Sequence, residues 1–278
     1  MENQDEKNRK LLVQISRKFN WIFGLRPAIL AEICIHLFTP RECRRIVRTA
    51  SGLRLFVDPF AHQGRSVVLN GKITEPEMES LFKAHLKERD TVLDLGANEG
   101  VISALAGLFA TEGLIIAVEP QTKLRDIIEI NLRINNVKNF KIFSNAFGGT
   151  GSTRLNIFPT TNTGASSIVG KYRFSRKSEE VYFISIEEIM RECNIRQIDF
   201  VKVDVEGFEA EVVDSLLPAI RQGNVKKILV EYHAKSLSQR NIKALDIHTK
   251  LITAGMEVIQ GDIETLAPSS QVFYGSSA

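Results

Sequence analysis

An apolar run that ends in a glycine-containing turn is the most constraining feature of this sequence. Residues 92–100 read VLDLGANEG, and an alanine-rich stretch over residues 101–110 follows directly. This pattern predicts a buried strand, a tight turn and a helix in direct succession. In that order, backbone N–H groups at the start of the helix can approach a bound ligand.

A second apolar run, over residues 114–118, leads to Glu119 and Pro120. Glu119 lies 23 residues after Gly96 (119 − 96), close to the ~20 residues expected for an acid that binds a ribose. The pair predicts a nucleoside site. A dinucleotide needs the turn G-x-G-x-x-G, which residues 96–100 do not provide, so NAD is disfavoured. Asp94 instead places a carboxylate where a cationic amino-acid head group could bind.

Four sequence blocks carry a resemblance to a known family. Residues 94–100 (DLGANEG) resemble motif I of the class I S-adenosylmethionine (AdoMet)-dependent methyltransferases. Together with residues 118–120 (VEP), 145–148 (NAFG) and 201–207 (VKVDVEG), they are similar to the FkbM-type methyltransferases over roughly residues 50 to 260. Two departures are Glu99, in a position that is often apolar in the family, and residues 162–167, which only loosely match its glycine-serine loop.

The resemblance implies methyl transfer from AdoMet to a hydroxyl group of a small molecule or glycan. It also implies a doubly wound, Rossmann-like α/β fold with a mostly parallel seven-stranded sheet and helices on both faces. The residues expected to bind AdoMet lie at the ends of the two strands described above or directly after the third strand. They are Asp94, Gly96, Ala97, Asn98, Gly100, Glu119, Pro120, Asn145 and Ala146.

The candidate catalytic residues follow the strand predicted over residues 198–203. Asp204 and Glu206 could serve as base and orienting group, or they could bind a divalent ion such as Mg²⁺ that acidifies the hydroxyl. The structural alternative is that Glu206 caps the next helix and that Asp204 binds loop backbone. Lys202 should point to the same face as Asp204 and form its charge partner.

His233 ends the next strand and is a further candidate for the general base, since its ordinary pKa lies near neutrality. A lone histidine is more often structural, and Glu231 is an alternative base. Asn145 could contact adenine through its amide or could simply form a turn. The other histidines and the three cysteines lack metal-ligand spacing, so no dedicated metal site is predicted.

The 278 residues allow one catalytic domain over residues 51–278 with a helical extension over residues 1–50. A net charge of +3 is too small to imply a nucleic-acid partner. Residues 19–38 are apolar but contain charges and a proline, which argues against a spanning helix. We expect them to pack on the domain or on a second copy of the chain, with peripheral membrane contact through residues 21–23 as an alternative.

The polar start of the chain does not resemble a signal peptide, so we expect a cytoplasmic protein. Four arginines, Arg41, Arg44, Arg45 and Arg48, have the spacing of one helical face. Further predictions are strands over residues 53–57 and 67–69, a helix over 237–254, and capping boxes at Thr74 and Ser185. Two other functions stay open: a nicotinamide-dependent oxidoreductase and a non-catalytic AdoMet-binding or scaffolding protein.

Overall fold

The computed structural model describes residues 44–59, 61–157, 166–169, 178–263 and 270–277. Residues 1–43 lie outside the described part of the chain. Most of the predicted helical extension, with the segments 19–38 and 21–23 and with Arg41, therefore stays a prediction. No helix among the described residues is long and apolar enough to cross a membrane.

In the described part of the chain, seven strands form one large sheet in the order β11–β12–β10–β9–β3–β4–β5. The five strands from β10 to β5 pair in parallel, and β12 is antiparallel to both of its neighbours. The predicted mostly parallel, seven-stranded sheet is thus confirmed. In chain order its strands are β3 (Thr91–Leu95), β4 (Leu114–Val118), β5 (Phe140–Phe143), β9 (Phe200–Val203), β10 (Lys227–Tyr232), β11 (Met256–Gln260) and β12 (Ser270–Ser276).

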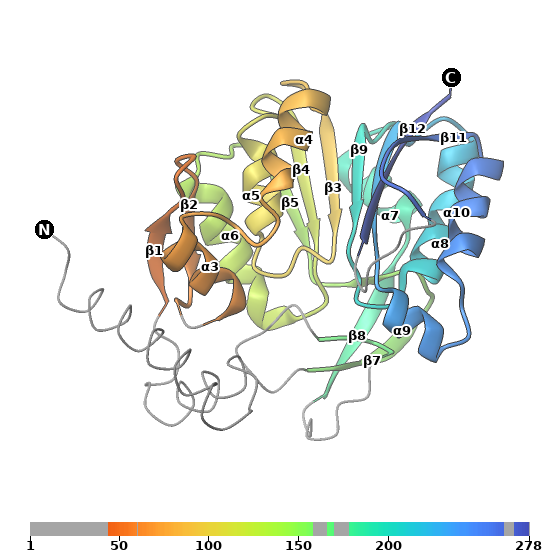
Figure 1. Ribbon diagram of the computed structural model, residues 1–278, viewed down its shortest axis with the longest axis horizontal. Coiled ribbons are helices and arrows are strands. Elements are labelled where there is room, and N and C mark those ends of the chain that lie inside the picture. Colours follow the sequence, from red (N-terminus) through yellow and green to blue (C-terminus); the bar gives the residue numbers. More distant parts are fainter. Residues whose placement is uncertain (1–43, 60, 158–165, 170–177, 264–269, 278) are drawn as a thin grey trace, which may run out of the picture.

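Helices cover both faces of this sheet, as Figure 1 shows. Side chains that alternate along β3 enter two separate cores, with Val92 in one and Leu93 in the other. Burial on both faces explains why the central strands read as continuous apolar runs. The first core includes α4 (Glu77–His85), α5 (Val101–Gly107) and α6 (Arg125–Ile134), and the second includes α7 (Ile186–Cys193), α8 (Glu209–Arg221) and α10 (Ala244–Thr253).

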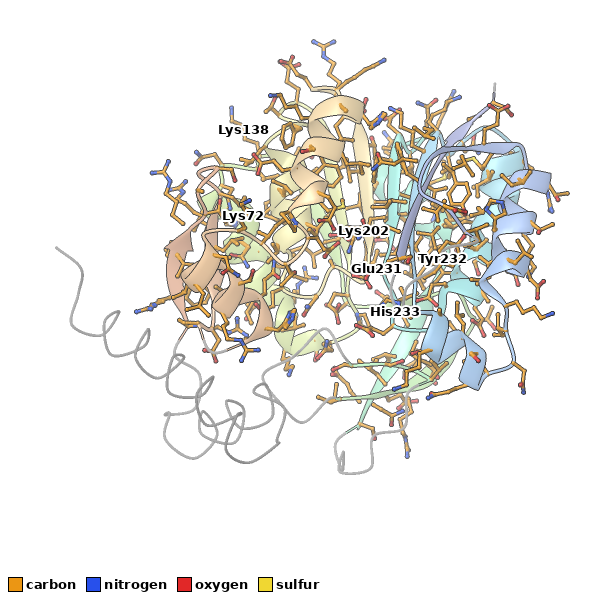
Figure 2. All side chains as sticks on the ribbon, viewed as in Figure 1. Lys72, Lys138, Lys202, Glu231, Tyr232 and His233 are labelled. Carbon is orange, nitrogen blue, oxygen red and sulfur yellow. The ribbon has the colours of Figure 1, made fainter. Side chains whose placement is uncertain are left out.

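The strand order reverses between β3 and β9. The chain runs outward from β3 to β4 and β5, and then returns to β9 on the other side of β3. Ligands of open α/β sheets bind at such a reversal, outside the carboxyl ends of the strands. His233, labelled in Figure 2, directly follows the carboxyl end of β10. A smaller sheet lies beyond that edge in Figure 1. Its order is β6–β8–β7, built from β6 (Ala146–Phe147), β7 (Ser152–Asn156) and β8 (Ser178–Ile184).

The predicted arginine stripe is wrong for the described residues. Residues Arg45–Arg48 form strand β1, which pairs antiparallel with β2 (Arg54–Val57). The turn between them is closed by the Thr49 hydroxyl, which accepts a hydrogen bond of 3.0 Å from the Leu53 N–H. Strand pairing places neighbouring residues on opposite faces, so helical spacing does not gather these arginines. The predicted boundary at residue 50 falls inside this hairpin.

Three other local predictions need correction. Residues 67–69 lie in helix α3 (His62–Asn70), because a short apolar run does not distinguish a strand from a helix. The Thr74 capping box does not form, since α4 begins after Pro76 and the Thr74 hydroxyl donates to Gln63. The helix expected over 237–254 is two helices, α9 (Ala234–Gln239) and α10. The capping box at Ser185 is confirmed at the start of α7.

Candidate active site

The turn after β3 lies in direct contact with the loop after β9. Gly96 has a φ of +84°, and a Cβ atom there would lie only 1.9 Å from the Asp204 carbonyl oxygen. The Gly96 and Ala97 N–H groups both donate to the Val118 carbonyl, at 3.0 and 3.1 Å. The carboxyl ends of β3, β4 and β9 therefore converge on one turn. Gly100 lies outside both cavities described below and packs its backbone against Ile128 of α6.

Glu119, at the end of β4, is buried beside this turn. One carboxylate oxygen accepts the Asn98 N–H at 2.9 Å, and the other accepts the Gln121 backbone and side-chain N–H groups at 2.9 and 3.1 Å. Burial raises the pKa of Glu119 to about 7, although these hydrogen bonds oppose the shift. The sequence spacing predicted Glu119 but not Gln121, which orients its carboxylate.

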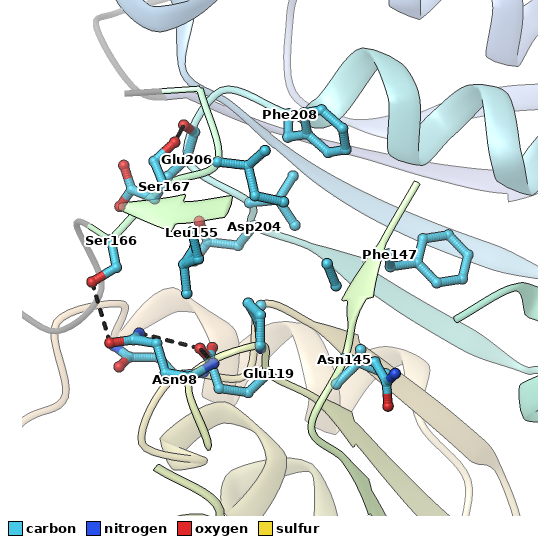
Figure 3. Close-up of a pocket in the computed structure, with 17 residues that line it drawn as sticks. Asn98, Glu119, Asn145, Phe147, Leu155, Ser166, Ser167, Asp204, Glu206 and Phe208 are labelled. Atoms are coloured by element: carbon cyan, nitrogen blue, oxygen red, sulfur yellow. Dashed lines mark hydrogen bonds between the residues drawn. The ribbon is translucent and has the colours of Figure 1, made fainter. Parts of the chain in front are cut away.

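A first cavity lies between the turn, the end of β4 and the small sheet (Figure 3). It encloses about 650 Å³, open solvent at its mouth included. Ser166 and Ser167, from the segment between β7 and β8, close it on one side, and Ser167 donates to the Glu206 carbonyl at 2.9 Å. Six predicted cofactor residues line it: Gly96, Asn98, Glu119, Pro120, Asn145 and Ala146.

Asn145 lines this cavity, but its side-chain amide is hydrogen-bonded to strand β8. The side-chain N–H donates to the Tyr182 carbonyl of β8 at 3.2 Å. Ala146 is buried at the cavity wall. The predicted contact of Asn145 with adenine stays a prediction.

Asp94, the single acidic residue of β3, is almost fully buried at 1% exposure. One of its carboxylate oxygens accepts the Ser103 hydroxyl at 2.6 Å. The other, Oδ1, is buried and has no hydrogen-bond partner within the described residues. Burial raises the pKa of Asp94, and the nearby Lys202 ammonium and the Ser103 hydroxyl oppose that rise. A buried, unpartnered carboxylate oxygen favours a cationic ligand.

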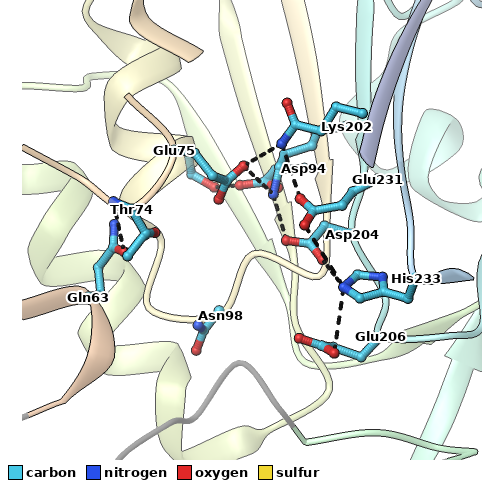
Figure 4. A network of polar contacts seen from close by, with 12 residues as sticks. Gln63, Thr74, Glu75, Asp94, Asn98, Lys202, Asp204, Glu206, Glu231 and His233 are labelled. Carbon is cyan, nitrogen blue, oxygen red and sulfur yellow. Dashed lines mark hydrogen bonds and ion pairs between the residues drawn. The ribbon is translucent and has the colours of Figure 1, made fainter. Parts of the chain in front are cut away.

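Asp94 belongs to a second cavity, of about 1030 Å³ with its open mouth included. Acidic side chains from several elements line it, as Figure 4 shows for Glu75, Asp204, Glu206 and Glu231. The two cavities meet, since both are lined by Gly96, Asn98, Asp204 and Glu206. Ala97 and His233, which were also predicted, line the second cavity but not the first.

Lys202 forms the predicted charge pair with Asp204. Its ammonium lies 2.8 Å from Asp204 Oδ2 and 3.6 Å from a carboxylate oxygen of Glu75, and it is 3% exposed. These carboxylates raise the pKa of Lys202 well above its ordinary value although burial opposes the shift. Burial alone would raise the pKa of Asp204, but Lys202 and His233 lower it. Asp204 is therefore an anion at neutral pH.

His233 is oriented by a buried glutamate that sequence reasoning missed. Its Nδ1 lies 2.7 Å from Glu209 Oε1, which also accepts the Gly207 N–H at 2.9 Å. Glu209 is fully buried. Burial would lower the pKa of His233, but Glu209, Asp204 and Glu206 raise it to about 9. The other ring nitrogen, Nε2, faces the second cavity.

Glu206 is held in the left-handed region of the backbone map with a φ of +50°. Such a conformation is costly for a residue with a side chain and is often found at functional sites. Its carboxylate faces His233 Nε2 at 3.6 Å, and burial raises its pKa to about 7. The alternative role of Glu206 as a helix cap is wrong, because helix α8 has no side-chain cap.

The FkbM methyltransferase family model matches residues 94–259, which run from the end of β3 into β11 and include most of the residues that line both cavities. The chain belongs to the FkbM methyltransferase family. It is therefore a class I AdoMet-dependent methyltransferase, and the oxidoreductase alternative is set aside. A search of curated protein sequences found no significant match.

Solved structures similar to this FkbM methyltransferase have low sequence identity. A putative rRNA methylase from Clostridium thermocellum has 13% identity and a TM-score of 0.48, over 73% of this chain and 94% of that one. Methanococcus jannaschii TYW2, solved with AdoMet, has 11% identity and a TM-score of 0.44, over 86% and 87%. A precorrin-6y C5,15-methyltransferase from Geobacter metallireducens has 14% identity and a TM-score of 0.43, over 74% of this chain and 90% of that one.

The unusual glutamate in the turn of this FkbM methyltransferase has a specific partner. Glu99 is 2% exposed and forms an ion pair of 2.8 Å with Arg44, which is 13% exposed and precedes β1. The Glu99 carbonyl also accepts the side-chain N–H of Asn131 at 2.7 Å. The hairpin and α6 therefore both fix the turn that contributes the Asn98 N–H to Glu119. Sequence reasoning missed this pair because the two residues are 55 positions apart.

We predict that Arg44→Met destabilises the fold by about 3 kcal/mol, because it leaves the buried Glu99 carboxylate unpaired. The double variant Arg44→Met, Glu99→Gln should recover most of that loss. Urea unfolding measures both. Arg89→Met is the matched control, since the Arg89–Glu112 pair is exposed (86% and 57%) and should contribute little. Equal effects of the two arginine variants would contradict the assigned role of Arg44.

Proposed function

We propose that this protein transfers the methyl group of AdoMet to a hydroxyl group of a small molecule or glycan. The observation that carries the proposal is the meeting of the two cavities at Asp204 and Glu206. One cavity has the acid and turn expected of a nucleoside site, and the other has a cluster of carboxylates and a histidine. A reaction between a cofactor and an acceptor needs such a junction, because the reacting atoms must be ~3–3.5 Å apart.

The described residues fit AdoMet in both of its polar parts. Glu119 has carboxylate lone pairs left to accept ribose hydroxyls, beyond its bonds to Asn98 and Gln121. The unpartnered Asp94 Oδ1 suits the ammonium group of the methionine part. Ala146 and Asn145 would then flank the adenine. When bound, AdoMet supplies an electrophilic methyl group.

The second cavity favours a neutral acceptor that is rich in hydroxyl groups. Its carboxylates, Glu75, Asp204, Glu206 and Glu231, accept hydrogen bonds from hydroxyls and would repel phosphate groups. This charge argues against a nucleic-acid acceptor. The residues we assign to the chemistry are Asp204, Glu206 and His233, here called the catalytic cluster. Asp204, kept ionised by Lys202, orients the hydroxyl, and the Glu206 carboxylate, whose pKa is about 7, takes up its proton. His233, with a pKa of about 9, is already protonated at neutral pH and faces both carboxylates.

Glu119→Gln should weaken binding of S-adenosylhomocysteine about 10-fold, because a neutral amide replaces the charged acceptor of the ribose hydroxyls. Since the pKa of Glu119 is about 7, the carboxylate is ionised above pH 7 and becomes protonated below it. Wild-type affinity should therefore fall as the pH is lowered from 8 to 6, and the variant should lose that dependence. Titration calorimetry measures both effects.

The matched control is Glu187→Gln, which removes an equal charge from the exposed first turn of α7. It should bind the ligand like the wild type at each pH. Wild-type affinity in a folded Glu119→Gln protein would remove Glu119 from the cofactor site.

Asp204→Asn should lower kcat by at least ~10²-fold while leaving the affinity for S-adenosylhomocysteine unchanged. The acceptor is first found by screening neutral sugars and other polyhydroxylated metabolites for release of S-adenosylhomocysteine. Asp214→Asn is the control, because Asp214 is half-exposed and pairs with Lys250 on the surface. An Asp204→Asn enzyme with the wild-type rate would exclude Asp204 from the reaction. Cofactor binding without turnover of any acceptor would favour the non-catalytic alternative.

A further inference from the structure

Three potential ligand atoms of the catalytic cluster point into one space. Asp204, Glu206 and His233 each offer one atom, and these atoms all lie within 4.8 Å of one another. His233 Nε2 lies 3.8 Å from Asp204 Oδ1 and 3.6 Å from Glu206 Oε2. Figure 4 shows the three side chains converging from the ends of β9 and β10.

These separations are too long for hydrogen bonds but suit ligands of a common ion. A hydrogen bond between a ring nitrogen and a carboxylate oxygen spans about 2.7 to 3.2 Å. Two ligands on one ion, with bonds of about 2.1 Å, are about 3 to 4.2 Å apart, depending on the angle between them. Both measured distances fall in the second range. The three atoms therefore have the spacing of a coordination shell.

Each of the three side chains is already oriented by a second contact. Glu209 holds His233 through Nδ1 at 2.7 Å and leaves Nε2 for a ligand. Metal-binding histidines are commonly fixed in this way by a carboxylate. Lys202 takes Asp204 Oδ2 at 2.8 Å, so that Oδ1 faces the histidine. The left-handed backbone of Glu206 directs its carboxylate to the same point.

A separate observation shows that negative charge outweighs positive charge at the site. Two carboxylates next to the cluster, Asp94 and Glu209, are at least 99% buried, and each has one buried oxygen without a hydrogen-bond partner in the described residues. Asp94 lines the same cavity as the cluster, and Glu209 touches His233. Buried anions of this kind need a compensating cation. Among the described residues that line the cavity, the positive groups are Lys202 and the protonated His233. They face six acidic residues: Glu75, Asp94, Glu99, Asp204, Glu206 and Glu231.

We propose that Asp204, Glu206 and His233 bind one divalent cation, for which Mn²⁺, an ion that accepts carboxylate ligands, is the probe. The proposal rests on the proposed function, because it assigns a metal to the same site. An ion there would supply a Lewis acid that holds the acceptor hydroxyl at the junction of the two cavities.

A second triad, Glu75, Asp204 and Glu231, is less suited to the ion. The Gln271 side-chain N–H donates to Glu75 at 3.0 Å and to Glu231 at 3.1 Å, so both carboxylates already have a donor. The side containing His233 is therefore the binding side.

Binding of Mn²⁺ to the full-length protein, freed of metal with EDTA, tests the proposal. The electron paramagnetic resonance signal of free Mn²⁺ should decrease to the extent of one bound ion per chain. Glu206→Gln should raise the Mn²⁺ Kd at least 10-fold, and so should Glu209→Gln, which acts only through His233. The control Glu257→Gln removes an exposed charge from β11 and should bind Mn²⁺ like the wild type.

Titration of the same samples with S-adenosylhomocysteine separates this proposal from the proposed function. No Mn²⁺ binding together with normal S-adenosylhomocysteine binding would overturn the metal site and leave the methyltransferase proposal standing. Equal Mn²⁺ binding by the wild type and a folded Glu206→Gln variant would also overturn it. Mg²⁺ should displace Mn²⁺ from the wild type. If Glu206→Gln weakens Mg²⁺ binding as much as it weakens Mn²⁺ binding, the result supports the site.

Discussion

The close approach of two loops at Gly96 is the constraint on which the site depends. The β3 turn lies against the Asp204 carbonyl so tightly that no side chain fits at Gly96. This contact joins the loop that lines the first cavity to the loop that carries Asp204 and Glu206. It exists because β3 and β9 are adjacent in the sheet although 104 residues (96–199) separate them along the chain. The strand order thus places the two cavities next to each other.

The two cavities differ in the charges that line them. In the first cavity, a single buried acid, Glu119, is satisfied by N–H groups of the turn and of Gln121. In the second, several carboxylates share one buried ammonium, that of Lys202. Burial makes this excess of negative charge costly unless cations or hydrogen-bond donors enter. An AdoMet ammonium, a hydroxylated acceptor and a divalent ion each supply what the second cavity lacks.

The grouping of residues around the first cavity was largely predictable because its signals are local. The strand, the turn and the acid after the next strand lie within 26 residues, from Asp94 to Glu119. Periodicity and spacing along the chain are enough to detect such a unit. The same reasoning misassigned the segment around Arg45, because its strand forms only through pairing with β2. A short segment of that kind takes its structure from its partner.

The second cavity was predicted only in part, since the residues that contact one another there come from distant positions in the sequence. The block that contains Lys202, Asp204 and Glu206 was visible in the sequence, but Glu75 reaches it from the loop before α4. Glu209 looked like an ordinary residue at the start of a helix, and only the fold places it against His233. A histidine alone is ambiguous, whereas a histidine held by a buried carboxylate and facing two more has a defined chemical task. The tertiary contact, rather than the residue type, makes His233 a candidate for catalysis or metal binding.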